Sequence, residues 1–248
     1  MSHTDEAEAQ ALERAGELAG VLDSVVVPSA CLVEWLPERL SFLLARENFS
    51  QFLGALRARL DITAGNLARA LFEEAMRWSW VDEDVETRRT AFLGEAAQRY
   101  RQVDEAVREL GIEPDDYYGP LVEDVLRAAE GAARFPRQIE GQLDWAPDDL
   151  RAMLYTQYRL FSQYTHSSIL AIASSAQQHD GQLVVGRLPQ VARLTVLRNA
   201  VSNMAVIVDG CKRGLHVPWG RQPPLHFRVM GYALEVAELV QPFAPATE

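Results

Sequence analysis

Apolar residues recur every three or four positions through most of this chain, which is the spacing of one face of an α-helix. The segments with this pattern are 4–22, 32–46, 48–60, a long helix from 61 through 78, 84–110, 119–133, 147–165 with apolar residues continuing to 176, 190–211 and 225–241. No pair of alternating apolar runs flanks a hairpin turn, so we expect no substantial sheet. The pattern predicts an all-α fold, a helical bundle of about seven to nine helices.

Several helix ends are marked by residues that favour them. Asp61 is typical of an N-cap, Pro37 of a first helical turn or a kink, and Gly111 of a helix end. The stretches 134–147 and 177–189 are predicted to be loops, and residues 183–185 could form a brief extended piece. We expect one helical domain over residues 1–248, with helices 1–60 as an appended subdomain in the alternative interpretation.

Composition places the chain among ordinary globular proteins. It has 248 residues, 48% hydrophobic and 24% charged, which excludes a wholly disordered or low-complexity chain. Its two cysteines, Cys31 and Cys211, cannot build a disulfide scaffold. We expect both to be buried free thiols in a reducing compartment.

The sequence gives no sign of export or of a membrane span. The first 20 residues are polar and acidic, unlike a signal peptide. The longest apolar stretch, residues 199–210, is too short to cross a bilayer and contains Ser202, Asn203 and Asp209. We therefore expect a soluble, cytoplasmic protein with no membrane partner.

Charge is distributed unevenly along the chain. The net charge of −11 argues against a protein coated in nucleic acid, because phosphate binding needs a basic face. Residues 151–248 contain nine basic and five acidic residues and so carry +4, whereas residues 1–150 carry −15. Either the acidic helices simply keep the protein soluble, or the C-terminal part presents a local basic surface to an anion.

Polar side chains gather on one face of the predicted helix 147–165 and its continuation. In YTQYRLFSQYTHSS, which starts at Tyr155, the residues Arg159, Ser162 and His166 stand at positions i, i+3 and i+7. Seven residues at 100° each return to within about 20° of the start, so these side chains share a face with Tyr155 one turn earlier. If this face is buried, each polar group needs a hydrogen-bond partner; if it lines a cleft, the groups form a site.

This pattern resembles the motif of the HEPN superfamily, an all-α group named for nucleotide binding in prokaryotes and higher eukaryotes. Its ribonuclease members carry an Arg, four to six residues and a His, matched here by Arg159 and His166. YRLFSQYTHSS together with ARALFEEAMRWSW, which starts at Ala68, also resembles a bacterial helical family of unknown function. The resemblance covers residues 60–210 and implies a HEPN-like core. Ribonuclease members usually dimerise and have a polar residue after the Arg, where this chain has Leu160.

The chemistry that the resemblance implies is metal-independent RNA cleavage. It needs a base of near-neutral pKa for the 2′-hydroxyl, which a histidine such as His166 supplies. It also needs a cation for the charge that develops on the phosphate, which Arg159 supplies. The prediction is an endoribonuclease of a toxin or defence system that acts on RNA as a homodimer and needs no cofactor.

Other interpretations stay open. Arg159 could be buried and paired with a carboxylate such as Glu73, with His166 hydrogen-bonded inside the bundle. The chain would then be a non-catalytic HEPN-like module that binds a protein partner or a nucleotide. A third hypothesis is a small-molecule enzyme or binder whose pocket is lined by Tyr155, Arg159, His166 and Glu73.

Three further polar features accompany these hypotheses. Arg69 and Glu73 have the i, i+4 spacing of an ion pair, on a helix so apolar that some of this charge could be buried, and we expect Arg159 or His166 to be the partner of Glu73. Asn203 faces either a polar pocket or helix-packing hydrogen bonds. The acidic runs 82–86 and 115–118 stand at predicted helix starts, where carboxylates are expected, so we predict no metal site.

Overall fold

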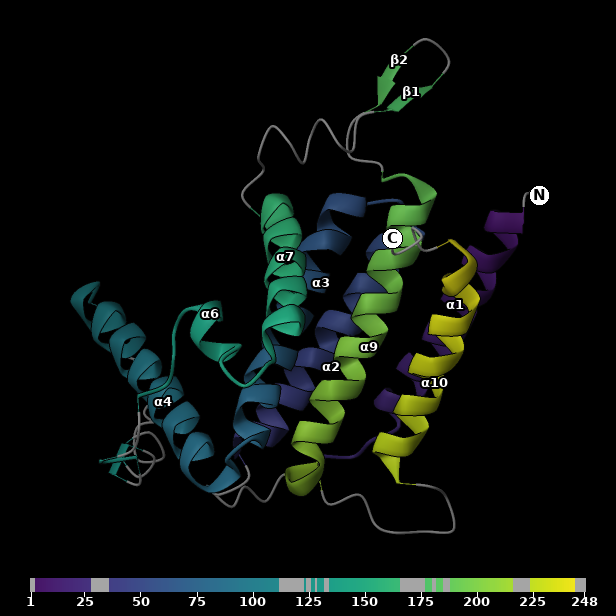
Figure 1. Cartoon of the computed structure of the whole chain (residues 1–248). Coiled ribbons are helices and arrows are strands. Elements are labelled where there is room, and N and C mark those ends of the chain that lie inside the picture. The colour runs from purple at the N-terminus through teal and green to yellow at the C-terminus, as the bar shows by residue number, and fades with distance from the viewer. Residues whose placement is uncertain are drawn as a thin grey trace.

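The fold is an all-α bundle, as the periodicity predicts. The computed structural model describes residues 3–27, 36–111, 123, 126–127, 129–131, 134–165, 177–179, 182–184, 188–215 and 224–243. Its helices are α1 (His3–Asp23), α2 (Leu36–Arg57), α3 (Asp61–Asp82), α4 (Val85–Glu109), α6 (Ile139–Gln142), α7 (Asp148–Thr165), α9 (Gln190–Leu215) and α10 (Leu225–Val240), followed by a 3₁₀ turn, Gln241–Phe243 (Figure 1). The described strands, β1 (Gln177–His179) and β2 (Gln182–Val184), form a short antiparallel hairpin.

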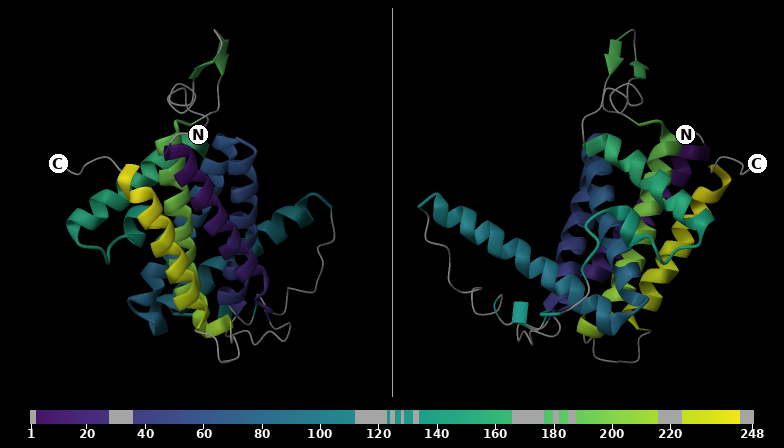
Figure 2. Two further views of the ribbon diagram at one scale, coloured as in Figure 1. Left: turned by 90° about the vertical axis from the view of Figure 1, so that its right-hand side faces the viewer. Right: turned by 60° about the vertical axis from the view of Figure 1, so that its left-hand side comes forward.

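Helices α1, α2, α3, α9 and α10 lie side by side and form the body of the protein (Figures 1 and 2). Asp61 contacts Arg193 at one end of α3 and α9, and Trp78 faces Gly210 near the other end. These two helices therefore run in the same direction. Helix α2 runs the opposite way, since Trp78 donates a hydrogen bond to Ser41 Oγ at 2.9 Å.

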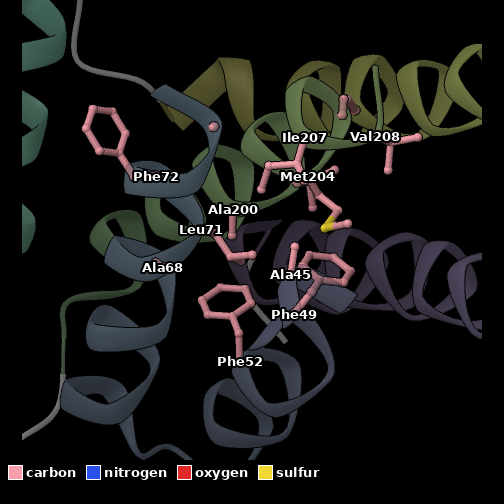
Figure 3. Packing of buried hydrophobic residues seen from close by; sticks show 14 of the residues in the cluster. Ala45, Phe49, Phe52, Ala68, Leu71, Phe72, Ala200, Met204, Ile207 and Val208 are labelled. Atoms are coloured by element: carbon pink, nitrogen blue, oxygen red, sulfur yellow. The ribbon is translucent and has the colours of Figure 1, made fainter. Parts of the chain in front are cut away.

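The core is filled by large side chains from α2, α3 and α9 (Figure 3). Phe52, Leu71 and Met204 are each 0% exposed, and most of the apolar face of these helices is buried. Helices α3 and α9 approach closely at Gly210, where an added Cβ would lie 2.7 Å from Trp78 Cβ. The glycine thus permits a contact that a larger residue would block.

A buried charge network joins the ends of four segments. The Arg193 side chain, 1% exposed, lies with Nη1 2.8 Å from Asp61 Oδ1 and Nη2 2.7 Å from Glu8 Oε1. It also donates to the Leu56 carbonyl at 2.8 Å, while Asp61 Oδ2 accepts the Leu188 N–H at 2.7 Å. Burial lowers the pKa of Arg193, against the opposing effect of Glu8 and Asp61.

This network corrects the predicted role of Asp61. The helix α3 begins at Asp61 itself, and the cap position, Leu60, makes no side-chain cap hydrogen bond. The carboxylate of Asp61 is taken up by Arg193 and the Leu188 N–H, which lie far away in sequence. A local pattern of capping residues cannot indicate a partner that lies so far away in the sequence.

Other predicted boundaries are confirmed or corrected. The segments 32–46 and 48–60 were predicted as two helices, but the helix α2 runs unbroken from 36 to 57, with Gln51 donating to Glu47 at 2.8 Å across the predicted break. Pro37 stands in its first turn, as predicted. Gly111 follows α4 with a φ of +74°, as expected for a helix end. The predicted helix 119–133 lies mostly outside the described residues.

The helix α4 extends away from the bundle, whereas α7 packs against α3 (Figures 1 and 2). Cys211 on α9 is a buried free thiol, as predicted, and Cys31 lies outside the described residues. By length and composition α9 could cross a membrane, but 61% of its most apolar window is buried inside the protein. A core helix has this property too, so the structure is compatible with a soluble protein.

Candidate functional site

The helix α7 carries three of the predicted site residues, Tyr155, Arg159 and Ser162, and is fixed to the bundle on one side. Phe161 is buried and packs on Phe72 of α3, with the ring centroids 5.9 Å apart. At the start of the helix, Arg151 donates hydrogen bonds to the carbonyls of Leu143, Asp144 and Ala146 at 2.9 to 3.1 Å. These contacts hold the preceding turn and set where the polar face of α7 lies.

Two tyrosines of this face each lie against an arginine, one from α7 itself and one from α3. Tyr155 and Tyr158 stack on each other with centroids 6.3 Å apart and an interplanar angle of 27°. The guanidinium carbon of Arg159 lies 5.9 Å from the Tyr155 ring centroid, and that of Arg69 lies 5.2 Å from the Tyr158 centroid. Both are within the range of a cation–π contact. Arg69 also donates to the Tyr158 hydroxyl at 3.3 Å, which connects α3 to α7.

Glu73 pairs with Arg69, its neighbour one turn earlier on α3. Glu73 Oε1 accepts from Arg69 Nε at 2.7 Å, with the two side chains 29% and 15% exposed. Arg77, the next basic residue of the row, binds Glu74 instead at 2.6 Å. The sequence favoured Arg159 or His166 as the partner of Glu73. A pairing with Arg159 is not found among the described residues, and His166 lies outside them. Arg69 keeps one buried atom, Nη1, without a hydrogen-bond partner.

Arg159 is exposed and, among the described residues, has no carboxylate partner. Its contact is the ring of Tyr155, which orients the guanidinium without neutralising its charge. An arginine in this position can bind an anion from solution with its N–H groups, two at a time when the anion is a phosphate. This is the chemical property that distinguishes Arg159 from Arg69.

The remaining predicted residues are placed less closely together. Ser162 is half-buried on α7. Asn203 is 7% exposed on α9, and its Nδ2 is buried without a hydrogen-bond partner. No hydrogen bond or ring contact within the described part of the chain joins Asn203 to the α7 face. His166 lies just beyond the described end of α7, so its predicted role is neither supported nor opposed.

Sequence reasoning gave less weight to Tyr158 than the structure does. Tyr158 is the residue through which Arg69 of α3 reaches α7. The sequence did indicate that Tyr158 belongs to this face, because it stands three residues after Tyr155 on the same helix. The spacing could not show which of the two arginines would lie over which ring.

A small pocket not expected from the sequence lies where the C-terminal parts of α3 and α9 meet the starts of α2 and α4. It is lined by Glu38, Trp78, Val81, Asp82, Val85, Arg89, Gly210, Lys212 and Arg213. Glu38 is 1% exposed, and its two oxygens accept from Arg89 at 2.5 and 3.0 Å. The ion pair with Arg89 therefore compensates the buried charge of Glu38. No group of three metal-binding side chains occurs within the described ranges.

Comparison with known proteins adds no relative. No protein-family model, no curated protein and no solved structure matches the chain. The function therefore has to be argued from the site itself.

Proposed function

We propose that this chain is a soluble, cytoplasmic, HEPN-like endoribonuclease that needs no metal and uses Arg159 and His166. The observation that carries the proposal is the exposed guanidinium of Arg159, free of carboxylate partners among the described residues. Glu73, the partner that would have neutralised it, is bound to Arg69. This arrangement supports an anion-binding role for Arg159 over a purely structural one.

The proposed reaction assigns each residue one task. His166 takes the proton of a ribose 2′-hydroxyl, and the 2′-oxygen attacks the adjacent phosphorus. The bond from phosphorus to the 5′-oxygen breaks, and the leaving oxygen receives a proton from the imidazolium or from water. Arg159 binds the phosphate oxygens and stabilises the charge that develops on them. The products are a 2′,3′-cyclic phosphate and a free 5′-hydroxyl.

The distribution of charge is consistent with a local site rather than an extended one. The whole chain carries −11, so an RNA strand would be repelled by most of its surface. Binding would depend on a few cations, which predicts a shallow dependence of affinity on salt, because few counterions are released. The proposal includes a homodimer that brings two motifs together, and a role as a bacterial toxin or defence component.

An RNA cleavage assay in the presence of EDTA tests the proposal. The wild type is compared with Arg159→Ala, His166→Ala and Arg213→Ala, the last being an exposed arginine at the far end of α9. We expect Arg159→Ala and His166→Ala to lose at least about a hundredfold in rate and Arg213→Ala to keep the wild-type rate. Circular dichroism establishes that each variant is folded. Equal cleavage by all four proteins, or none by the wild type on varied RNAs, would overturn the proposal.

A second candidate function is favoured by the apolar residues that flank Arg159. Met153 and Leu160 are 59% and 56% exposed and stand seven residues apart, on one side of α7. Exposed apolar groups beside an exposed arginine are typical of a surface that binds a protein or a second copy of the chain. If α7 is such a surface, Leu160→Asp lowers the mass measured by sedimentation, and Arg159→Ala leaves the rate of RNA cleavage unchanged.

A further inference from the structure

The helix α10 exposes an apolar stripe on the side turned away from the core. Phe227, Met230 and Leu234 are 64%, 45% and 59% exposed and stand at positions i, i+3 and i+7. The opposite side of the same helix packs into the bundle through residues such as Val229 and Val236, both 0% exposed. A helix that is apolar on both sides has more hydrophobic surface than its own core uses.

Acidic side chains border this stripe. The helix α1 packs along α10, and Arg14 of α1 lies 3.4 Å from Glu235 of α10 (Figure 2, left). The exposed carboxylates near this contact are those of Glu13 and Glu17 on α1 and of Glu235 and Glu238 on α10, and Glu6 continues the same side of α1. Arg14 is itself paired with Glu17 at 2.8 Å. At 100° per residue, Glu6, Glu13 and Glu17 share one exposed side of α1, and Glu17 is linked to α10 through Arg14.

We propose that the α1–α10 face binds a basic amphipathic helix of another protein. The three apolar side chains have the spacing that accepts the i, i+3 or i+4, and i+7 residues of a docked helix. The acidic border complements lysines and arginines on the sides of such a helix, and so selects a basic partner. This interaction is separate from the proposed RNA site on α7.

The same border disfavours the other occupants of an apolar face. In a symmetric dimer the same patch meets itself, so a second copy would bring these carboxylates against one another. An anionic lipid surface would be repelled by them as well. A basic helix is the occupant that satisfies both the apolar stripe and the charge.

Binding of synthetic peptides of about 18 residues tests the proposal on the full chain. One peptide carries Leu on one face and Lys on the rest, a second replaces each Lys by Glu, and a third scrambles the first so that its apolar face is lost. By fluorescence anisotropy we expect the first to bind at least about tenfold more tightly than the others. Leu234→Asp should weaken it by about tenfold or more, and Glu13→Lys with Glu17→Lys should lower its advantage over the acidic peptide.

A matched variant separates this face from general hydrophobic attraction. Leu44→Asp replaces an equally exposed leucine, 57% exposed, on α2 and should leave peptide binding unchanged. Equal losses in the two variants, or equal binding of the scrambled peptide, would overturn the proposal. So would self-association, or binding to phosphatidylglycerol vesicles, that Leu234→Asp abolishes. RNA cleavage by Leu234→Asp should equal that of the wild type, so the two proposals fail separately.

Discussion

Arg193 Nη1 lies 2.8 Å from Asp61 Oδ1, and the two side chains are 1% and 0% exposed. The contact joins the N-terminal ends of α3 and α9, and Glu8 brings α1 to the same guanidinium. One Glu8 oxygen, Oε2, is buried without a hydrogen-bond partner, whereas both carboxylate oxygens of Asp61 accept a hydrogen bond. Removing Asp61 leaves the Leu188 N–H and Arg193 Nη1 buried without their acceptor.

Asp61→Ala should therefore destabilise the protein strongly. Leaving a buried donor without its acceptor costs about 1–3 kcal/mol. Asp61→Ala leaves two such donors, the Leu188 N–H and Arg193 Nη1, although Arg193 keeps its ion pair with Glu8. Urea denaturation followed by circular dichroism measures the change in the free energy of unfolding. The control is Glu17→Ala in the exposed pair with Arg14, which should cost less than about 1 kcal/mol. Similar losses in both variants would contradict a special role for the buried network.

Glu73 should be coupled to Arg69 and not to Arg159. In a double-mutant cycle, Arg69→Ala and Glu73→Ala should show a coupling energy of about 0.3–1 kcal/mol, the range for partly exposed ion pairs. Glu73→Ala and Arg159→Ala should be additive, since no contact joins them among the described residues. Chemical denaturation of the wild type, the three single variants and the two double variants gives both cycles. Coupling between Glu73 and Arg159 instead would restore the structural interpretation of Arg159.

Gly210→Ala should destabilise the contact between α3 and α9. The new Cβ would lie 2.7 Å from Trp78 Cβ, so the two helices must separate, at a cost of about 1–3 kcal/mol. Gly54→Ala on α2 is the matched control, because nothing lies within 4 Å of its Cβ position. It should raise stability by about 0.5–1 kcal/mol through helix propensity. Thermal unfolding of both variants measures the difference in sign; two changes of the same sign would count against this packing.

The Cys211 thiol should be unreactive in the folded protein. Burial raises its pKa well above the ordinary value, and the nearby Glu74 and Glu38 act in the same direction. The reactive thiolate is therefore scarce near neutral pH. In a Cys31→Ser variant, Ellman's reagent at about pH 8 should label Cys211 only after urea is added. Rapid labelling without urea would show that α9 opens locally.

Much of the fold was predictable because helical periodicity is a local signal. The long apolar stripes of α3, α9 and α10 fixed the helices and the all-α class. The pairing of Asp61 with Arg193, 132 residues apart, was not predictable, because no local pattern identifies a distant partner. The break near residue 47 was wrong for the opposite reason: polar residues interrupt the pattern there while the backbone continues as helix.

The candidate site was predicted as a set of residue types on one face, which is as far as spacing reaches. The sequence placed Tyr155, Arg159 and Ser162 on α7, and Arg69 and Glu73 at the spacing of an ion pair. It favoured Arg159 or His166 as the partner of Glu73, whereas the structure pairs Glu73 with Arg69. The partner of Glu73 depends on where α3 and α7 cross. At this crossing Arg69 contacts both Glu73 on its own helix and Tyr158 on α7.

Binding of an RNA that carries 2′-O-methyl groups throughout, and so cannot be cleaved, is the most direct test of the central claim about Arg159. The affinities of the wild type, Arg159→Ala and Arg213→Ala are compared by filter binding at one fixed salt concentration. A charged hydrogen bond to phosphate contributes about 1.5–3 kcal/mol, so Arg159→Ala should weaken binding by about ten- to a hundredfold. Arg213→Ala should bind as the wild type does. Equal affinity of Arg159→Ala and the wild type would contradict the account.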